Sequence, residues 1–383
     1  MTSLQQLTKQ AASLALNANE VEADRVMTVC NACRYCEGFC AVFPAMTSRL
    51  AFNKSDLHYM ANLCHNCGAC LHACQYAAPH EFAINVPVAL ARVRKDTYAE
   101  YAWPRAFGVL YARNGVVITL ALVAAFALFL MLTIAKQGTL FSTPASANFY
   151  SIFPHGLMVS MFAPIFLFAC FALAMGVRSF WKHAPEASTS NLPTAQFEAL
   201  RNALTLKYLD GGHGEGCNDE DDRFTHRRRV FHHFTFYGFA LCFAATSVAT
   251  LYHYAFNQPA PYPLWSAPKI LGLTGGIAMV VGTLGLLWLH SRRHPAHREA
   301  TQSGMDVGFI VILFLVASTG LLLVLAKSSA AMPLALATHL ATVMAFFVLM
   351  PYSKFAHGFF RAAALLKYSI EKRAQKKAQI PGD

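Results

Sequence analysis

The sequence predicts a mostly α-helical protein in two parts: a helical, cysteine-rich module at the N-terminus and a six-helix transmembrane bundle after it. Of the 383 residues, 55% are hydrophobic and only 13% are charged, whereas an average soluble domain is about one quarter charged. Six apolar stretches are long enough to cross about 30 Å of hydrocarbon, which takes roughly 20 helical residues. Eight of the eleven cysteines lie between residues 30 and 74. An ordinary soluble globule and a disordered chain are therefore excluded.

The N-terminal module is expected to cover residues 1–113. Apolar residues recur at three- and four-residue steps over 54–63 and 88–98, which predicts a helix in each range. No basic segment followed by an apolar stretch opens the chain, so we expect no cleavable signal peptide. The N-terminus should therefore stay in the cytoplasm.

The cysteines of this module repeat one spacing, Cys-x2-Cys-x2-Cys-x3-Cys. In two-cluster ferredoxins the first three cysteines of such a run hold one cubane, and the fourth reaches the other. The repeat predicts a ferredoxin-like module with two [4Fe–4S] clusters. The first would be held by Cys30, Cys33, Cys36 and Cys74, and the second by Cys64, Cys67, Cys70 and Cys40. Zinc sites and disulfides are the alternatives. A zinc site built from two Cys-x2-Cys pairs does not need the third and fourth cysteines of each run at this spacing.

The transmembrane bundle is expected to cover residues 114–383. Its spans are predicted near 115–135, 154–177, 233–256, 268–290, 305–326 and 333–352, and the polar segment 178–232 is the one long connection. Basic residues are retained on the cytoplasmic side. With the N-terminus inside, only Lys136, Lys269 and Lys327 of the 31 basic residues fall at the outer ends. We therefore expect a multi-pass protein with both termini in the cytoplasm.

The net charge of +11 is explained by contact with anionic lipid, without nucleic acid as a partner. Several of the basic residues lie in the C-terminal tail, 367–377. We interpret this tail as a solvated, basic helix end.

Two histidines of the last span are candidate haem ligands. Ionisable residues in apolar spans are rare and costly, so each histidine there is a functional candidate. His339 and His357 are 18 residues apart, which is five turns of an α-helix and predicts that both project from one face, about 27 Å apart. One helix would then offer an imidazole near each membrane surface, and the bundle is predicted to bind haem.

The third span supplies partners for these histidines. His232 and His233 stand at its cytoplasmic end and His253 near its outer end. Since the third and sixth spans run in opposite directions, either inner histidine would meet His357, and His253 would meet the other histidine of the last span. This predicts one or two b haems. His155, at the outer start of the second span, is the alternative outer ligand.

Two further segments and one absent motif complete the set of expectations. The segment 210–222 is rich in glycine and acidic residues, and we interpret it as a flexible connector in preference to a docking surface or a cofactor contact. The three histidines in 290–297 are interpreted as part of a charged cytoplasmic stop. No G-x-G-x-x-G follows a strand pattern, so a flavin or NAD would have to sit on a partner protein.

The order of these parts resembles the tricarballylate/citrate utilization protein B family over nearly the whole chain. The motifs CNACRYCEGFC, CHNCGACLHAC, RRRVFHHFTFYGFALCFAATSVATLYHY and PYSKFAHGF carry the resemblance. The last motif, with His339 upstream, also resembles the final helix of respiratory nitrate reductase gamma subunits, where both histidines bind haem. A His-x2-Phe-x-Gly-Phe pattern of related haem subunits implies His233 with His357 as the inner pair. In the gamma subunit the partner of this final helix carries two histidines ten residues apart. Aligning that partner helix with the third span implies that Cys242 stands where the second histidine would be.

The resemblance implies an electron-transfer protein of a bacterial cytoplasmic (inner) membrane. It would reoxidise a partner FAD-dependent dehydrogenase that acts on tricarballylate, through two [4Fe–4S] clusters and b haem, and pass electrons to the quinone pool. The residues themselves indicate only an electron path without a substrate site, so whether the chain is itself an enzyme stays open.

Two other functions remain open at this point. The first is a tricarboxylate transporter with a regulatory iron–sulfur domain, because transporters often break helices at glycines such as those in 272–276. No Arg or Lys stands mid-span to pair with such a substrate. The second is a membrane-anchored iron–sulfur redox sensor, which leaves the histidines without a purpose.

Overall fold

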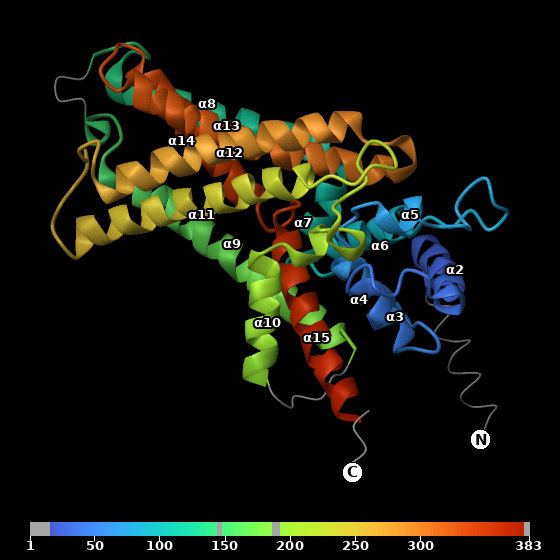
Figure 1. Cartoon of the computed structure of the whole chain (residues 1–383). Coiled ribbons are helices and arrows are strands. Elements are labelled where there is room, and N and C mark those ends of the chain that lie inside the picture. The colour runs from blue at the N-terminus through green and yellow to red at the C-terminus, as the bar shows by residue number, and fades with distance from the viewer. Residues whose placement is uncertain (1–15, 144–147, 186–191, 379–383) are drawn as a thin grey trace.

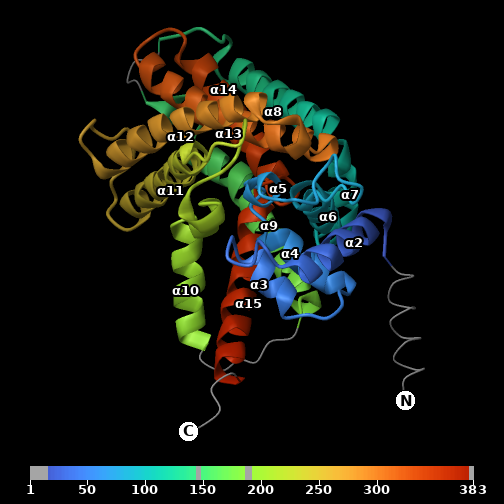
Figure 2. The same cartoon turned by 45° about the vertical axis from the view of Figure 1, so that its right-hand side comes forward.

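The structure is a computed structural model and is described here for residues 16–143, 148–185 and 192–378. Within these ranges the regular structure is helical, apart from one isolated bridge between Cys217 and Thr225. Six helices are long and apolar enough to cross a membrane, which confirms the predicted number of spans. Figures 1 and 2 show the long helices side by side, with the short helices of the N-terminal module gathered beside them.

The N-terminal module is built from five short helices, three of which begin at an asparagine cap. Asn17, Asn53 and Asn85 each accept a hydrogen bond from the backbone N–H three residues on, which satisfies a donor that the first helical turn leaves free. Glu20 and Asp56 complete two capping boxes. The helices are α2 (Ala18–Cys33), α3 (Val42–Thr47), α4 (Lys54–Leu63), α5 (Ala69–His72) and α6 (Val86–Glu100). α4 and α6 confirm the two helices predicted from apolar periodicity.

The first span of the bundle is longer than its hydropathy predicts. It begins at α7 (Arg105–Leu110) and continues through the 3-10 turn η1 (Tyr111–Arg113) into α8 (Asn114–Gln137). The predicted domain boundary at residue 113 therefore falls inside a continuous span. The other long helices are α9 (His155–His183), α11 (Arg227–Tyr254), α12 (Ala267–Arg292), α13 (Ala300–Ala326) and α14 (Met332–Leu349); the 3-10 turns η2 (Phe149–Ser151) and η5 (Pro295–His297) precede α9 and α13.

Helices α11 and α12 pack closely because glycines face each other. A Cβ added at Gly238 would lie 2.7 Å from a backbone nitrogen of α12, and one added at Gly275 would lie 2.8 Å from a carbonyl oxygen of α11. Small residues of this kind allow membrane helices to approach closely enough for dispersion contacts. α12 is one unbroken helix through 272–276. The helix break on which the transporter interpretation relied is therefore absent from this described helix.

The last predicted span is interrupted before it reaches its second histidine. α14 ends just before Pro351, the chain turns over 350–355, and α15 (Ala356–Ala378) follows. Proline has no N–H to donate, and its ring clashes with the carbonyl four residues earlier, so a regular helix ends there. The prediction that His339 and His357 project from one helix face is therefore wrong, because His339 lies in α14 and His357 in α15.

The long connection packs against the C-terminal helix. It contains α10 (Leu192–Leu204), η3 (Lys207–Leu209) and η4 (Gly212–Gly214). α10 lies beside α15 (Figure 2), where Glu198 accepts hydrogen bonds from Lys372 (2.9 Å) and Arg373. α15 also meets the N-terminal module through an ion pair between Arg49 and Glu371 (2.6 Å). The described part of the basic tail is thus held by acidic partners, in contrast to the predicted solvated end.

Candidate metal centres

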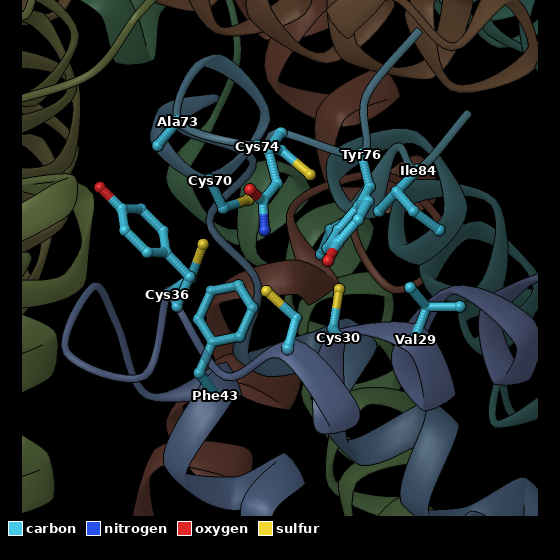
Figure 3. A pocket seen from close by; sticks show the side chains of 13 residues that line it. Val29, Cys30, Cys36, Phe43, Cys70, Ala73, Cys74, Tyr76 and Ile84 are labelled. Atoms are coloured by element: carbon cyan, nitrogen blue, oxygen red, sulfur yellow. The ribbon is translucent and has the colours of Figure 1, made fainter. Parts of the chain in front are cut away.

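The first predicted cysteine set borders a single pocket. The cavity measures about 250 Å³ and is bordered by Cys30, Cys33, Cys36 and Cys74. In Figure 3 the sulfur atoms of Cys30, Cys36 and Cys74 turn toward the same space. Its apolar wall includes Val29, Phe43, Tyr76 and Ile84. Four thiols in a largely apolar pocket are the donor set that a [4Fe–4S] cluster requires.

Two thiols of this pocket, those of Cys30 and Cys36, are neutral until a metal displaces their protons. Burial, and after it the neighbouring cysteines, raises the pKa of Cys30 and of Cys36 to about 12. Metal ligation requires thiolates, so loading the site releases protons.

The second predicted set borders a neighbouring and tighter pocket. Cys40, Cys64, Cys67 and Cys70 surround a space of about 20 Å³, so these thiols would have to spread to admit a cluster. Cys70 borders both pockets, which makes the two sites adjacent. The fourth cysteine of each run thus lies with the first three of the other run, as the spacing predicts.

Three arginines hold the loop of the second set against the bundle. The Asn66 carbonyl accepts hydrogen bonds from Arg228 (2.6 Å) and Arg293 (2.9 Å). The Cys64 carbonyl accepts one from Arg361 (2.8 Å). These guanidinium groups come from α11, from the residue after α12 and from α15. Their positive charges would stabilise the thiolates of a loaded site.

At the end of the bundle that lies beside the N-terminal module, His232 faces His357. The ring centroids lie 6.1 Å apart, with the planes at 78°. Two imidazoles that bind one metal from opposite sides, each at about 2 Å, have centroids roughly 6 Å apart. His357 Nδ1 is hydrogen-bonded to the Lys354 carbonyl, which leaves Nε2 for a ligand bond. His232 Nδ1 is buried without a hydrogen-bond partner. Both residues fit a bis-histidine haem.

His233 points away from this pair. Its ring lies against Tyr237, with centroids 5.7 Å apart, and approaches the backbone of Leu204 at the end of α10. Successive residues of an α-helix project about 100° apart, so only one of the two neighbouring histidines can face α15. The inner pair implied by the resemblance, His233 with His357, is therefore not the pair that the structure brings together.

The predicted outer pair is not formed either. His253 stacks on His155 with ring centroids 4.0 Å apart and planes at 16°, which leaves no room for a metal between the rings. His339 lies against α13 instead, where its Nδ1 is 3.1 Å from Thr319 Oγ1. The ring fits there because Gly320 has no side chain, and a Cβ would lie 3.0 Å from it. The described outer histidines thus offer no bis-histidine site.

His65 is a candidate residue that the sequence reasoning missed. It follows the cluster cysteine Cys64, is buried, and its Nδ1 is 2.9 Å from the Leu63 carbonyl oxygen. Burial first, then the charge of Arg361 and the proximity of His232, lowers the pKa of His65 well below its usual range. His65 therefore lies near both the second cysteine set and the inner histidine pair. Its position beside a cysteine was the available signal.

The segment 210–222 is not a flexible connector. Cys217 and Thr225 exchange two backbone hydrogen bonds of 2.9 Å, and the Asn218 N–H donates to the Cys67 carbonyl at 3.0 Å. The segment is therefore fastened to the second cysteine loop. The composition rich in glycine and acidic residues gave no sign of these partners, because both lie outside the segment.

The last of the histidines after the fourth span is buried. The Nε2 of His297 lies 2.9 Å from Nε2 of His72, whose Nδ1 lies 2.6 Å from an Asp222 carboxylate oxygen. Burial, and then the charge of Arg293, lowers the pKa of His297 to about 3, so this ring is neutral. The ring connects the bundle to the second cysteine run. The prediction that this histidine is part of a charged stop is therefore wrong for His297.

A second group of possible metal ligands lies inside the N-terminal module. Single ligand atoms of Glu20, His58 and Glu100 lie within 4.8 Å of one another. Lys54 Nζ lies 2.9 Å from Glu100 and 3.7 Å from Glu20. The lysine ammonium already supplies the positive charge that a metal ion would bring, so we interpret this group as a structural ion network.

The fold and the two cysteine sets define a helical membrane protein with a ferredoxin-like domain at its N-terminus. The chain belongs to the citrate utilization protein B family. The family model for citrate utilization protein B matches residues 109–378, and the one for the citrate utilization protein B Fer4-like domain matches residues 23–100. The chain is 57% identical to citrate utilization protein B of Escherichia coli over 368 aligned residues. The alignment covers 96% of this chain and 97% of that protein. No solved structure matches the chain. The family resemblance seen in the motifs is confirmed.

Proposed function

We propose that this protein is a membrane-bound electron-transfer component of citrate or tricarballylate utilization. It takes electrons from a partner FAD-dependent dehydrogenase, such as a tricarballylate dehydrogenase, and delivers them to quinone. The name of the Escherichia coli relative supports the utilization role, and the six apolar helices support a membrane location.

The proposal rests mainly on one observation: the candidate ligands form a continuous series from the module into the bundle. Cys70 borders both cysteine pockets, and His65 borders the second. His232 lies close enough to His65 to lower the pKa of His65. His232 in turn faces His357. A series of adjacent sites of this kind suits the transfer of electrons in short steps.

The chain supplies the ligands and controls their surroundings. When bound, two [4Fe–4S] clusters and a b haem would each carry one electron at a time between a two-electron flavin and a two-electron quinone. The eight cysteines would hold the clusters, and the apolar wall of the first pocket limits the access of water. His232 and His357 would hold one haem, and the Lys354 carbonyl fixes the tautomer of His357.

The surface beside the first pocket is the side on which the dehydrogenase would dock. Tyr35 borders this pocket and is 69% exposed. Phe82 is 42% exposed and lies against Tyr76 of the pocket wall, with ring centroids 5.7 Å apart. Exposed apolar side chains near a cofactor pocket are typical of a surface that binds a partner.

The decisive experiment uses the anaerobically purified full chain. We expect about eight cluster irons with matching sulfide and one b haem by the pyridine haemochrome assay. Tricarballylate should then bleach the cluster absorbance and reduce the haem only when the flavoprotein is added, and a quinone analogue should reoxidise both. Colourless protein, or oxidation of tricarballylate by this chain alone, would contradict the proposal. Counter-flow of citrate in proteoliposomes without haem reduction would favour the transporter.

A further inference from the structure

Segment 210–222 forms a tight turn that only glycines allow. Gly211, Gly214 and Gly216 all have positive φ angles, at 69°, 88° and 111°. A Cβ on Gly211 would lie 1.5 Å from the Gly216 carbonyl oxygen, so no other residue fits there. The turn closes with a hydrogen bond of 2.5 Å from the Gly216 N–H to the Asp210 carbonyl. This rigid turn presents the residue that follows it, Cys217.

Cys217 is buried against the second cysteine set. It has 0% exposure and forms a small cluster with Leu206 and Leu209, against which Cys67 packs. The Asn218 N–H holds the two segments together through the Cys67 carbonyl. The side chains of Cys217 and Cys67 are therefore neighbours. The second site therefore contains five cysteines, one more than a cluster requires.

The chemistry of a cubane leaves the fifth cysteine without an iron. A [4Fe–4S] cluster takes four cysteine thiolates, and those of the second site are assigned to Cys40, Cys64, Cys67 and Cys70. A thiol that stays protonated beside a ligand sulfur can donate a hydrogen bond to it. Hydrogen bonds to the sulfurs are among the factors that set the reduction potential of such clusters.

We propose that Cys217 donates a hydrogen bond from its thiol to the Cys67 sulfur of the second cluster and thereby raises the reduction potential of that cluster. Reduction adds one electron, and the donor stabilises the extra negative charge while no bond breaks. The effect would make the second cluster, the one nearer His65 and His232, the better electron acceptor of the two. This inference rests on the proposed iron–sulfur function.

The thiol has one competing acceptor. The Leu209 carbonyl oxygen lies 3.3 Å from Cys217 Sγ. In the loaded site the Cys67 sulfur is an iron-bound thiolate, and hydrogen bonds to a charged acceptor are about twice as strong as neutral ones. The thiol hydrogen therefore turns to Cys67 when the cluster is present.

The test compares three variants of the full chain in detergent. Cys217→Ala removes the donor, Cys217→Ser keeps a donor of shorter reach, and Cys170→Ala makes the same change at a cysteine in the middle of span α9. Redox titration followed by electron paramagnetic resonance measures the midpoint potential of each cluster, and the signals are assigned with Cys40→Ser and Cys74→Ser.

For Cys217→Ala we expect the equilibrium constant for reduction of the second cluster to fall about tenfold. This lowers the midpoint potential of that cluster by about 59 mV for one electron, while the potential of the first cluster stays the same. Cys217→Ser should shift it less, and Cys170→Ala should not shift it. An unchanged potential in Cys217→Ala, or an equal shift in Ala and Ser, overturns the inference. Selective loss of the second cluster in Cys217→Ala also overturns it, because Cys217 would then be a ligand.

A measurement on the unmodified protein covers the case in which Cys217→Ala fails to fold. Infrared difference spectroscopy of the holoprotein should show an S–H stretching band that moves to lower frequency when the second cluster is reduced, and this band should be missing in Cys217→Ser. If no S–H band responds, the inference fails. If the wild-type protein holds no cluster at all, the proposed function fails first, and iron and sulfide analysis separates the two results.

Discussion

His232 of α11 and His357 of α15 face each other with ring centroids 6.1 Å apart and planes at 78°. The two helices are far apart in the sequence, because α12, α13 and α14 lie between them. The turn at Pro351 releases α15 from the line of α14, which brings His357 to the start of α11. His357 therefore meets its partner from a helix separate from the one that holds His339.

This geometry separates two neighbouring histidines by function. We expect His232→Ala and His357→Ala to abolish b haem, because each removes one axial ligand, and His233→Ala to retain it. The pyridine haemochrome assay and the Soret absorbance of purified protein measure the outcome. His233→Ala is the matched control, since it makes the same change one residue away. Loss of haem in His233→Ala together with its retention in His232→Ala would reverse the assignment.

The outer histidines are expected not to bind haem. His339 is hydrogen-bonded to Thr319, and His253 stacks on His155. Single alanine substitutions at these three histidines should leave the haem-to-protein ratio unchanged from that of the wild-type protein. Removing the His339 ring should lower the free energy of unfolding by about 1 kcal/mol through the lost hydrogen bond. A drop in haem content to half in any of these variants would show a second haem.

The exchange of fourth cysteines between the two runs can be tested directly. Cys74→Ser should deplete the first cluster, whose pocket it borders, although Cys74 belongs to the second run. Cys40→Ser should deplete the second cluster. Iron and sulfide analysis with electron paramagnetic resonance should show one cluster weakened and the other intact in each variant. The inverse result would mean that each run holds its own cluster, and Cys170→Ser serves as the unaffected control.

A largely buried ion pair close to His357 should contribute strongly to stability. Lys354 pairs with Asp306, and breaking a buried pair from one side leaves a charge uncompensated. We expect Asp306→Asn to lower the free energy of unfolding by about 3–5 kcal/mol at pH 7. Replacing both partners, as Asp306→Asn with Lys354→Met, should recover most of this loss. Denaturant unfolding in detergent measures both variants, and an equal loss in the double variant would contradict the explanation.

The same pair gives the Asp306→Asn variant a defined pH dependence. Burial outweighs the attraction of Asp306 and lowers the pKa of Lys354 from 10.5 to about 8. Between these values the unfolded chain holds a proton that the folded chain has released, so this residue makes stability rise with pH over that range. In Asp306→Asn the opposing attraction is gone, so the pKa of Lys354 falls further. The stability deficit should therefore shrink as pH rises toward about 8 and stay constant once Lys354 is neutral in both folded proteins. A deficit that stays constant from pH 7 to 10 would exclude Lys354 as its cause.

The helices and the cysteine sets were predictable because their signals are local. Asn53 and Asp56 cap a helix from within its first turn, and the apolar length of each span is a property of consecutive residues. The cysteine spacing brings three thiols into one loop before any tertiary contact forms. The exchange of the fourth cysteine was predictable only because the spacing repeats a known cluster-binding pattern.

The histidine pairing could not be predicted because it depends on the rotation of one helix. His232 and His233 are adjacent, and periodicity gives both an equal claim to His357. The rotation of α11 is fixed by its glycine contact with α12, where Gly238 meets Gly275. The residues around these two glycines do not indicate which of the two histidines the packing turns toward α15.

By itself the sequence determined the composition of the parts: six membrane helices, a capped helical module, and two groups of cysteines with the spacing of cluster ligands. Only the tertiary structure decided which groups meet. It selected His232 over its neighbour, separated His339 from His357, and brought Cys217 to Cys67. The physical reason is that helix formation and loop spacing depend on residues a few positions apart. Partners from distant segments depend instead on how whole helices rotate, approach and end when they pack.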